Sequence, residues 1–196
     1  MLNLILLDNE SIIDVNYEDI VEIILSQNIV SIFQGRSEAG PRALGNRTIT
    51  LDPRNPSGKN IVNTVKMREG FRPFAASIML EHIHDWFNMA GLKESPFMMY
   101  AVEALPGVID KVPSVIHVDN SCRIQTVTEL QNFHWYSLIK YFYNRTGIPM
   151  LFNTSFNIAG ETIVETLDDA LSTLRRSKIE YLWLPEESKL VIIPNI

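Results

Sequence analysis

The feature of this sequence that most constrains its fold is the alternation of short β-branched runs with amphipathic helical segments. Residues 29–34 (IVSIFQ) form an apolar run that ends at Gly35, which is typical of a buried strand. Residues 132–144 instead repeat large apolar side chains at helical spacing, with Gly147 just beyond them. This alternation, with some connections short enough for hairpins, predicts an α/β (α+β) fold: a twisted mixed sheet with flanking helices.

The same patterns place the remaining elements. Strands are expected at 29–34, 48–51, 74–79, 97–103, 115–118, 123–127, 148–152, 179–184 and 190–193, and 1–9 is either a short strand or an ordered lead-in. Helices are expected at 17–27, 59–67, 80–88, 132–144 and 166–174. Asn16 is a candidate cap for the first helix, and Thr166 with Asp169 resembles a capping box.

Length and composition indicate one globular domain over residues 1–196. Apolar residues make up 46% of the chain and charged residues 20%, which argues against bulk disorder. The single cysteine, Cys122, excludes an intrachain disulfide and favours a reducing compartment, so we expect a cytoplasmic protein. No apolar run approaches the roughly 18 residues of a membrane span.

Positive charge is concentrated in one segment, residues 35–72. Its net charge is +5, whereas the whole chain carries −6, which leaves −11 elsewhere. The segment is also rich in glycine, which lets backbone approach a ligand closely. Guanidinium groups match phosphate and carboxylate oxygens in pairs, so the segment suits an anion; the alternative is a solvated basic face. The acidic total argues against a general nucleic-acid coat.

Two details favour the ligand site over the solvated face. Lys66 and Arg72 flank a turn that contains Gly70 and Pro73, and turns fix cations more firmly than exposed helix faces do. A polar corner, Asn153-Thr154-Ser155, directly follows a predicted buried strand, and the ends of strands are favoured ligand positions in α/β folds. Together they suit a nucleotide or an acyl phosphate.

Other constellations carry less information. Neither a P-loop nor a GxGxxG motif is present. His82 and His84 are two residues apart on a predicted helix, so their rings do not share a metal-binding face. His117 is either a ligand or a structural histidine, with the second favoured. Cys122 either has its pKa lowered by Arg123 or is an incidental small residue, again with the second favoured.

Four blocks of the sequence resemble one enzyme family. They are GRSEAGPRALGNRTITLDPR, NTVKMREGFRPFAASIM, HVDNSCRIQTV and NRTGIPMLFNTSFNIAGETIVETLDDAL. They are similar to the C-terminal, YrdC-like domain of the carbamoyltransferases that include the nodulation and antibiotic O-carbamoyltransferases. The resemblance implies that this domain uses ATP and carbamoyl phosphate to form carbamoyl adenylate. A separate Kae1-like domain, absent from this chain, would then transfer the carbamoyl group to a hydroxyl acceptor.

The resemblance also implies roles for individual residues. Lys66 and Arg72 would be catalytic, through electrostatic stabilisation of phosphate oxygens. Substrate and nucleotide contacts would come from Arg42, Arg123, Asn153 and Ser155. The basic segment and the polar corner themselves add Arg36, Arg47 and Thr154 as candidate contacts. Mg²⁺ would be held by the phosphates and not by a protein cage. The loop at 120–122 departs from the family pattern, so two alternatives stay open: a non-catalytic nucleotide-binding or interaction subunit, and, less favoured, an RNA-binding module.

Overall fold

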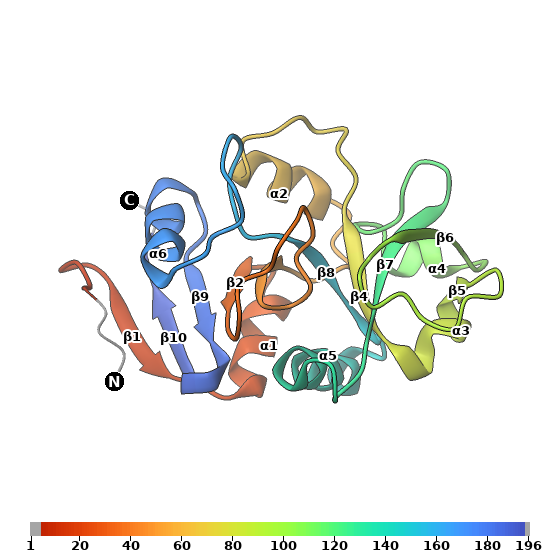
Figure 1. Cartoon of the computed structure of the whole chain (residues 1–196), viewed down its shortest axis with the longest axis horizontal. Helices are drawn as coiled ribbons and strands as arrows, with labels where there is room; N and C mark the ends of the chain where they lie inside the picture. The colour runs from red at the N-terminus through yellow and green to blue at the C-terminus, as the bar shows by residue number, and fades with distance from the viewer. Residues whose placement is uncertain (1–4, 195–196) are drawn as a thin grey trace.

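A computed structural model describes residues 5–194, and within them ten strands form one mixed sheet. The strand order is β1-β10-β9-β2-β3-β8-β4-β7-β6-β5, and the sheet runs across the whole molecule (Figure 1). The pairs β2–β9 and β4–β7 are parallel and the other neighbouring pairs are antiparallel. The strands are β1 Ser11–Asp14, β2 Val30–Phe33, β3 Arg47–Thr50, β4 Ala75–Met79, β5 Phe87–Asn88, β6 Tyr100–Ala104, β7 Ser121–Val127, β8 Met150–Ser155, β9 Tyr181–Leu184 and β10 Lys189–Ile192.

The three helices with clear caps, α1, α5 and α6, begin within one residue of the predicted start and end within two residues of the predicted end. Asn16 accepts from the backbone N–H of Asp19, and Thr166 accepts from that of Asp169; both form complete capping boxes. The helices are α1 Tyr17–Leu25, α2 Gly58–Val65, α3 Ile83–Trp86, α4 Val108–Lys111, α5 Phe133–Thr146 and α6 Leu167–Arg176, with short 3₁₀ turns η1 Leu80–His82 and η2 Pro185–Glu187. No helix of the described residues is long and apolar enough to span a membrane.

The centre of the sheet is covered on both faces. Every residue of β3 and β4 is buried; β4 is apolar or small in sequence, whereas β3 buries Arg47 and two threonines with Ile49. The apolar stripe of α5, which consists of Trp135, Leu138, Ile139 and Phe142, is buried as predicted. In Figure 1, α5 and α1 lie below the central strands and α2 lies above them. The upper side, near α2, is where the long loops gather.

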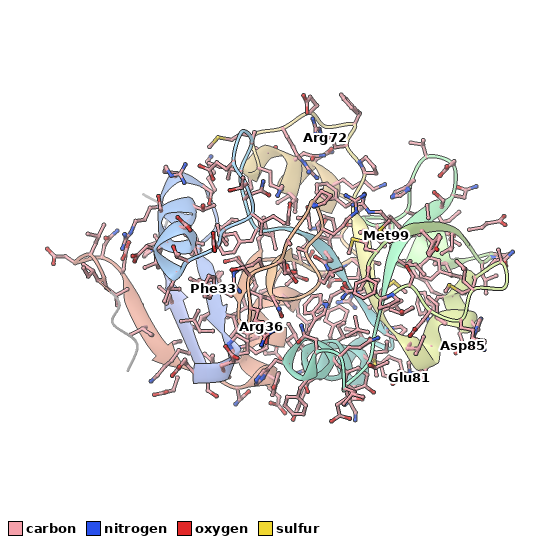
Figure 2. The ribbon with its side chains drawn as sticks, viewed as in Figure 1. Phe33, Arg36, Arg72, Glu81, Asp85 and Met99 are labelled. Atoms are coloured by element: carbon pink, nitrogen blue, oxygen red, sulfur yellow. The ribbon has the colours of Figure 1, made fainter. Side chains whose placement is uncertain are left out.

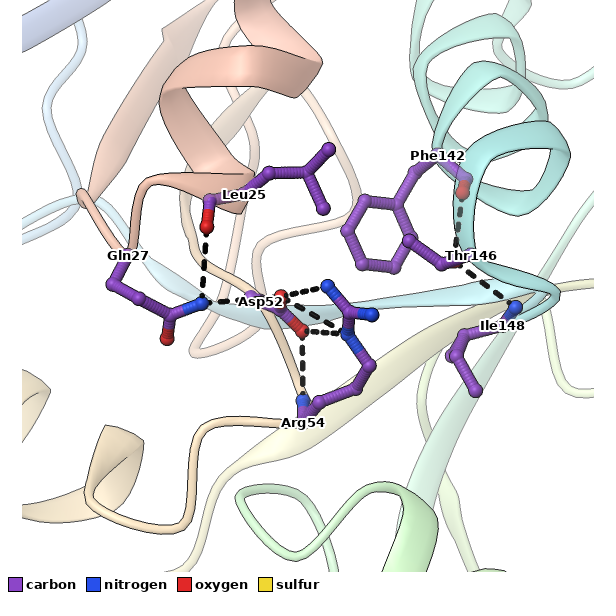
Figure 3. A network of polar contacts seen from close by, with 7 residues as sticks. All are labelled: Leu25, Gln27, Asp52, Arg54, Phe142, Thr146 and Ile148. Atoms are coloured by element: carbon purple, nitrogen blue, oxygen red, sulfur yellow. Dashed lines mark hydrogen bonds and ion pairs between the residues drawn. The ribbon is translucent and has the colours of Figure 1, made fainter.

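One buried carboxylate fixes the lower end of β3. Asp52 is fully buried and accepts from the Arg54 side chain at both oxygens, with Nη2 at 2.6 Å from Oδ2 (Figure 3). Gln27, at the end of α1, donates to the same carboxylate at 3.3 Å. Arg54 also lies over the ring of Phe142 in α5, 5.5 Å from its centroid. This cluster joins α1, β3 and α5. It gives Arg54, one of the cations of the basic segment, a structural role.

Three predicted elements differ from the structure. The predicted helix 80–88 is a 3₁₀ turn and a single helical turn, after which Phe87 is extended and pairs with Ala104 of β6, so sheet pairing overrides a helical apolar pattern. The predicted strand 115–118 is a turn in which His117 N–H bonds to Ser121. Of the predicted lead-in 1–9, residues 5–9 contain no strand and 1–4 lie outside the described residues; β1 begins at Ser11.

Candidate functional site

Four strand ends bring distant parts of the sequence together at the upper side of the sheet. Pairing of β4 with β7 and β8 places Arg123, Ala75 and Asn153 in one row. Pairing of β3 with β8 places Thr48 beside Ser155. The loops that enter β3 and β4, and the loop that leaves β8, therefore emerge next to one another. This follows from the antiparallel orientation of β8 to both neighbours.

These loops enclose a cavity of about 930 Å³. Its walls are residues 40–43, 66–69 with 72–73, and 153–155 with 157–163, together with Met98 and Arg123. Figure 1 shows the three loops, in orange, tan and blue, rising on the same side of the sheet. The volume lies within the roughly 300–1,000 Å³ typical of small-molecule pockets. The cavity is the site at which the predicted residues can be compared.

Cations dominate the cavity wall. They are Arg42, Lys66, Arg68, Arg72 and Arg123. The two carboxylates in the wall are both engaged: Glu69 accepts from Arg72 at 2.8 Å, and Glu161 is paired with Arg176 of α6. The wall therefore carries an excess of positive charge in a protein whose net charge is −6.

Three guanidinium nitrogens in this wall are buried without a hydrogen-bond partner among the described residues. They are Arg42 Nε, Arg68 Nη2 and Arg123 Nε. Burial, followed by the neighbouring charges of Arg72 and Arg123, lowers the pKa of Arg68 to about 10. Burial and then the charge of Arg42 lower the pKa of Arg123. Unpaired buried donors are costly, so an arrangement of like charges of this kind favours an anion between them.

Lys66 connects two of the segments that line the cavity through hydrogen bonds. Its side chain is almost fully buried, and its Nζ donates to the Ser155 carbonyl, to Ser155 Oγ at 3.3 Å, and to the carbonyl and Oδ1 of Asn157, both at 2.9 Å. Its own carbonyl accepts from Ala159 N–H at 2.9 Å. Burial, and secondarily the charge of Arg68, lowers the pKa of Lys66 to about 7. Four oxygen acceptors oppose that shift by favouring the ammonium form.

Asn153 belongs to the cavity wall, but its side-chain amide is engaged in a buried polar network. Its Nδ2 donates to the Ala43 carbonyl at 3.0 Å, to Ser77 Oγ at 2.8 Å and to Gln125 Oε1 at 3.2 Å. Its Oδ1 accepts from Thr48 Oγ1 at 3.2 Å. The predicted role of Asn153, direct contact with a planar carbamoyl group, does not fit an amide whose groups are already used in this way. Its contribution is to fix the carbonyl next to Arg42.

The remaining predicted residues divide into two groups. Arg42, Arg72, Arg123, Thr154 and Ser155 line the cavity together with Lys66, and Arg72 lies at its outer rim with a half-exposed side chain (Figure 2). Arg36 and Arg47 are absent from the wall that the described residues form. Figure 2 shows Arg36 well away from Arg72, beside Phe33.

The position of Arg47 has a clear physical reason. It is almost fully buried at the start of β3, where its guanidinium stacks on the Phe33 ring at 3.6 Å. It donates to the Gln34 carbonyl at 2.5 Å and to the Glu165 carbonyl at 3.2 Å. The prediction that Arg47 contacts nucleotide does not match this position, since Arg47 lies outside the cavity wall of the described residues and its Nη1 and Nη2 already hold backbone carbonyls, although its buried Nε has no partner among those residues.

Sequence reasoning missed two residues of the site. Arg68 lines the cavity, lies 4.3 Å above the Phe74 ring, and donates from Nε to Asn63 at 2.8 Å. Asn157 supplies two of the four Lys66 acceptors. The available signal was spacing: Arg68 is two residues after Lys66, and Asn157 two after Ser155.

The open alternatives for His117 and Cys122 are settled by their surroundings. His117 Nε2 bonds the Phe74 carbonyl at 2.8 Å and Nδ1 bonds Ser121 Oγ at 3.1 Å, so both ring nitrogens serve structure. Burial raises the pKa of the Cys122 thiol to about 12, which outweighs the opposing effect of Arg123. Across the described residues, no group of three or more His, Cys, Asp or Glu side chains could hold a metal ion.

The fold and the cavity define an α/β protein with a cationic cavity, and comparison with known proteins identifies its family. Two solved structures share the fold at 12–14% identity: full-length HypF in its phosphate- and nucleotide-bound form (TM-score 0.54) and T. kodakarensis HypF (TM-score 0.55), each over 85% of this chain and 21% of the other. The fold is therefore α/β and YrdC-like. The family model "Carbamoyltransferase C-terminus" matches residues 21–189, and the chain belongs to this family.

Curated relatives agree with this assignment. Nodulation protein NolNO of Sinorhizobium fredii is 41% identical over 79% of this chain. Nodulation protein NolO of Bradyrhizobium diazoefficiens is 39% identical over 79%, and nodulation protein U of Rhizobium tropici is 33% identical over 84%. The chain spans only 23–28% of the length of these three relatives.

Proposed function

We propose that the cavity binds the polyphosphate of ATP and activates a carbamoyl group as carbamoyl adenylate. The observation that carries this proposal is the set of three unpartnered guanidinium nitrogens in one wall with Lys66 and Arg72. Phosphate oxygens accept hydrogen bonds from guanidinium forks and balance several positive charges at once. Membership of the carbamoyltransferase family supports the choice of a carbamoyl donor, carbamoyl phosphate.

The proposed half-reaction balances as follows. Hydrolysis of carbamoyl phosphate gives carbamate and phosphate. A carbamate oxygen then forms a bond to the α-phosphorus of ATP as the bond from that phosphorus to the bridging oxygen breaks, and pyrophosphate leaves. Negative charge develops on the α-phosphate and on the leaving group, where Arg42, Arg68 and Arg123 would stabilise it by position and charge.

The chain's own groups suggest how Mg²⁺ and a partner would fit. The two carboxylates in the cavity wall are paired with arginines, so Mg²⁺ would be bound mainly through the phosphates of ATP. Transfer to a hydroxyl would need an acceptor site, which we assign to a separate Kae1-like domain. The relatives' additional length leaves room for such a domain.

Isotope exchange tests the half-reaction. The chain is mixed with ATP, Mg²⁺, carbamoyl phosphate and labelled pyrophosphate, and label in ATP is measured over time. Exchange that depends on carbamoyl phosphate, and that is lost in Arg123→Gln but kept in Arg36→Gln, supports the proposal. Arg36 is the control because this arginine is not part of the cavity wall that the described residues form. No exchange, with or without a purified Kae1-like carbamoyltransferase domain, would count against it.

One observation favours a second candidate function, a nucleotide-binding subunit without turnover. The Lys66 ammonium, predicted to be catalytic, is committed to four oxygens of the loop after β8. Under this alternative, ATP raises the melting temperature of the chain but no label enters ATP.

A further inference from the structure

Glu38 folds back into its own loop and binds three of that loop's backbone N–H groups. Its Oε1 accepts from Leu44 at 2.8 Å and from Asn46 at 3.0 Å, and its Oε2 accepts from Arg47 at 3.1 Å. The carboxylate is therefore the centre of the loop 38–47, and Arg42 lies at the middle of that loop. Glu38 itself faces a second cavity of about 560 Å³, on the other side of the loop from the cationic one.

The loop's carbonyl groups are held separately, from the strands. Asn153 donates to the Ala43 carbonyl at 3.0 Å, Gln125 to the Leu44 carbonyl at 2.9 Å, and Gln34 to the Gly45 carbonyl at 2.8 Å. Three amides thus fix carbonyls 43–45, and one carboxylate fixes the N–H groups of 44, 46 and 47. A segment without helix or strand is held almost completely by side chains.

Packing against α5 restricts the backbone conformation of this loop. Gly45 has φ +108°, and a Cβ there would lie 2.5 Å from the Trp135 ring. The loop therefore sits directly on α5. Both Glu38 oxygens are used, so a side-chain amide at this position would turn one NH₂ group toward a backbone donor. Only a carboxylate serves all three N–H groups.

We infer that Glu38 is a positioning residue for Arg42: it fixes the loop so that the Arg42 guanidinium stays directed into the cationic cavity. The inference rests on the proposed function, because it concerns the same cavity. Among the described residues the Arg42 guanidinium makes one hydrogen bond, of 3.4 Å from Nη1 to the carbonyl of Pro41 in the same loop. Its orientation therefore depends on the loop backbone and not on side-chain partners.

A double-mutant cycle tests the inference, with inorganic pyrophosphate as the probe in isothermal titration calorimetry. Arg42→Gln should weaken pyrophosphate binding by about tenfold or more, the usual effect of losing a hydrogen bond to a charged group. Glu38→Gln should weaken it nearly as much, and the double variant should bind no more weakly than R42Q. Glu187→Gln, an exposed acid outside both cavities, controls for the change in net charge.

A merely structural role gives a different pattern, in which E38Q lowers the melting temperature but binds pyrophosphate as the wild type does. That result would overturn the inference, and so would additive losses in the double variant. If E38Q does not fold, Glu38→Asp replaces it in the cycle, because the shorter carboxylate cannot reach all three N–H groups. If the wild type binds no pyrophosphate, the proposed function fails; if it binds and the cycle is additive, only the role of Glu38 fails.

Discussion

Replacing Arg68 by glutamine should make the free protein more stable while removing its affinity for anions. The pKa of Arg68 is lowered from 12.5 to about 10, chiefly by burial and then by Arg72 and Arg123. At about 1.36 kcal/mol per unit the upper limit of this cost is about 3 kcal/mol, and solvent screening around the partly exposed side chain reduces it to about 2 kcal/mol. Because the folded pKa lies below the unfolded one, this cost is fully present at pH values below about 10, and so at neutral pH.

Part of that gain is offset by lost contacts. Arg68→Gln gives up the 2.8 Å bond to Asn63 and the stacking on Phe74, together about 1–2 kcal/mol. The net gain is therefore at most about 1 kcal/mol, which corresponds to an increase in Tm of up to about 4 °C for a chain of this size. Wild-type protein in pyrophosphate at about 100 times its Kd should gain about 2.7 kcal/mol, and R68Q should gain far less.

Thermal denaturation with and without pyrophosphate measures both effects. Arg145→Gln is the control, because this exposed arginine pairs with Glu22 on the helical side of the molecule. It should change Tm little and keep the full pyrophosphate shift. An R68Q protein that melts below the wild type without pyrophosphate, and is still stabilised by it, would refute the reasoning.

Three further predictions concern single residues. The pKa of Lys66 is about 7 and a bound anion favours its charged form, so the affinity for sulfate should fall as the pH rises from about 6 to about 9. The Lys66→Met variant should bind sulfate more weakly, and its affinity should not fall over this pH range. An equal dependence of sulfate affinity on pH in the two proteins would contradict this prediction. Asn153→Leu should lower the free energy of unfolding in urea by about 1–3 kcal/mol, because the Ala43 carbonyl loses its partner; an unchanged value would show that the network contributes nothing. The Cys122 thiol, buried with its pKa raised to about 12, should react with a thiol reagent at pH 8 only after unfolding, and a rapid native reaction would show that the thiol is accessible.

Much of the fold could be predicted because local and tertiary forces agree there. The capping boxes at Asn16 and Thr166 and the buried stripe of α5 are readable from spacing alone. Prediction is wrong where burial and local pattern compete. Phe87 continues a helical apolar pattern but pairs with Ala104 at the sheet edge, and Val115 and Ile116 are buried in a turn.

The site was predictable in composition but not in the direction of its side chains. The sequence indicates that Arg42, Lys66 and Ser155 gather around an anion, and the structure places all three along one cavity. It does not reveal that the Arg47 guanidinium packs on the Phe33 ring. Nor does it reveal that the Asn153 amide forms hydrogen bonds with Ala43, Ser77, Gln125 and Thr48. Those directions depend on strand register, which a single sequence leaves open.

A crystal structure of the chain with bound pyrophosphate tests the central claim most directly. The account predicts phosphate oxygens within about 3 Å of Arg42 Nε, Arg68 Nη2 and Arg123 Nε, the three buried donors of the cavity wall that have no hydrogen-bond partner among the described residues. Pyrophosphate bound elsewhere, or a cavity that stays free of it at saturating concentration, would contradict the claim.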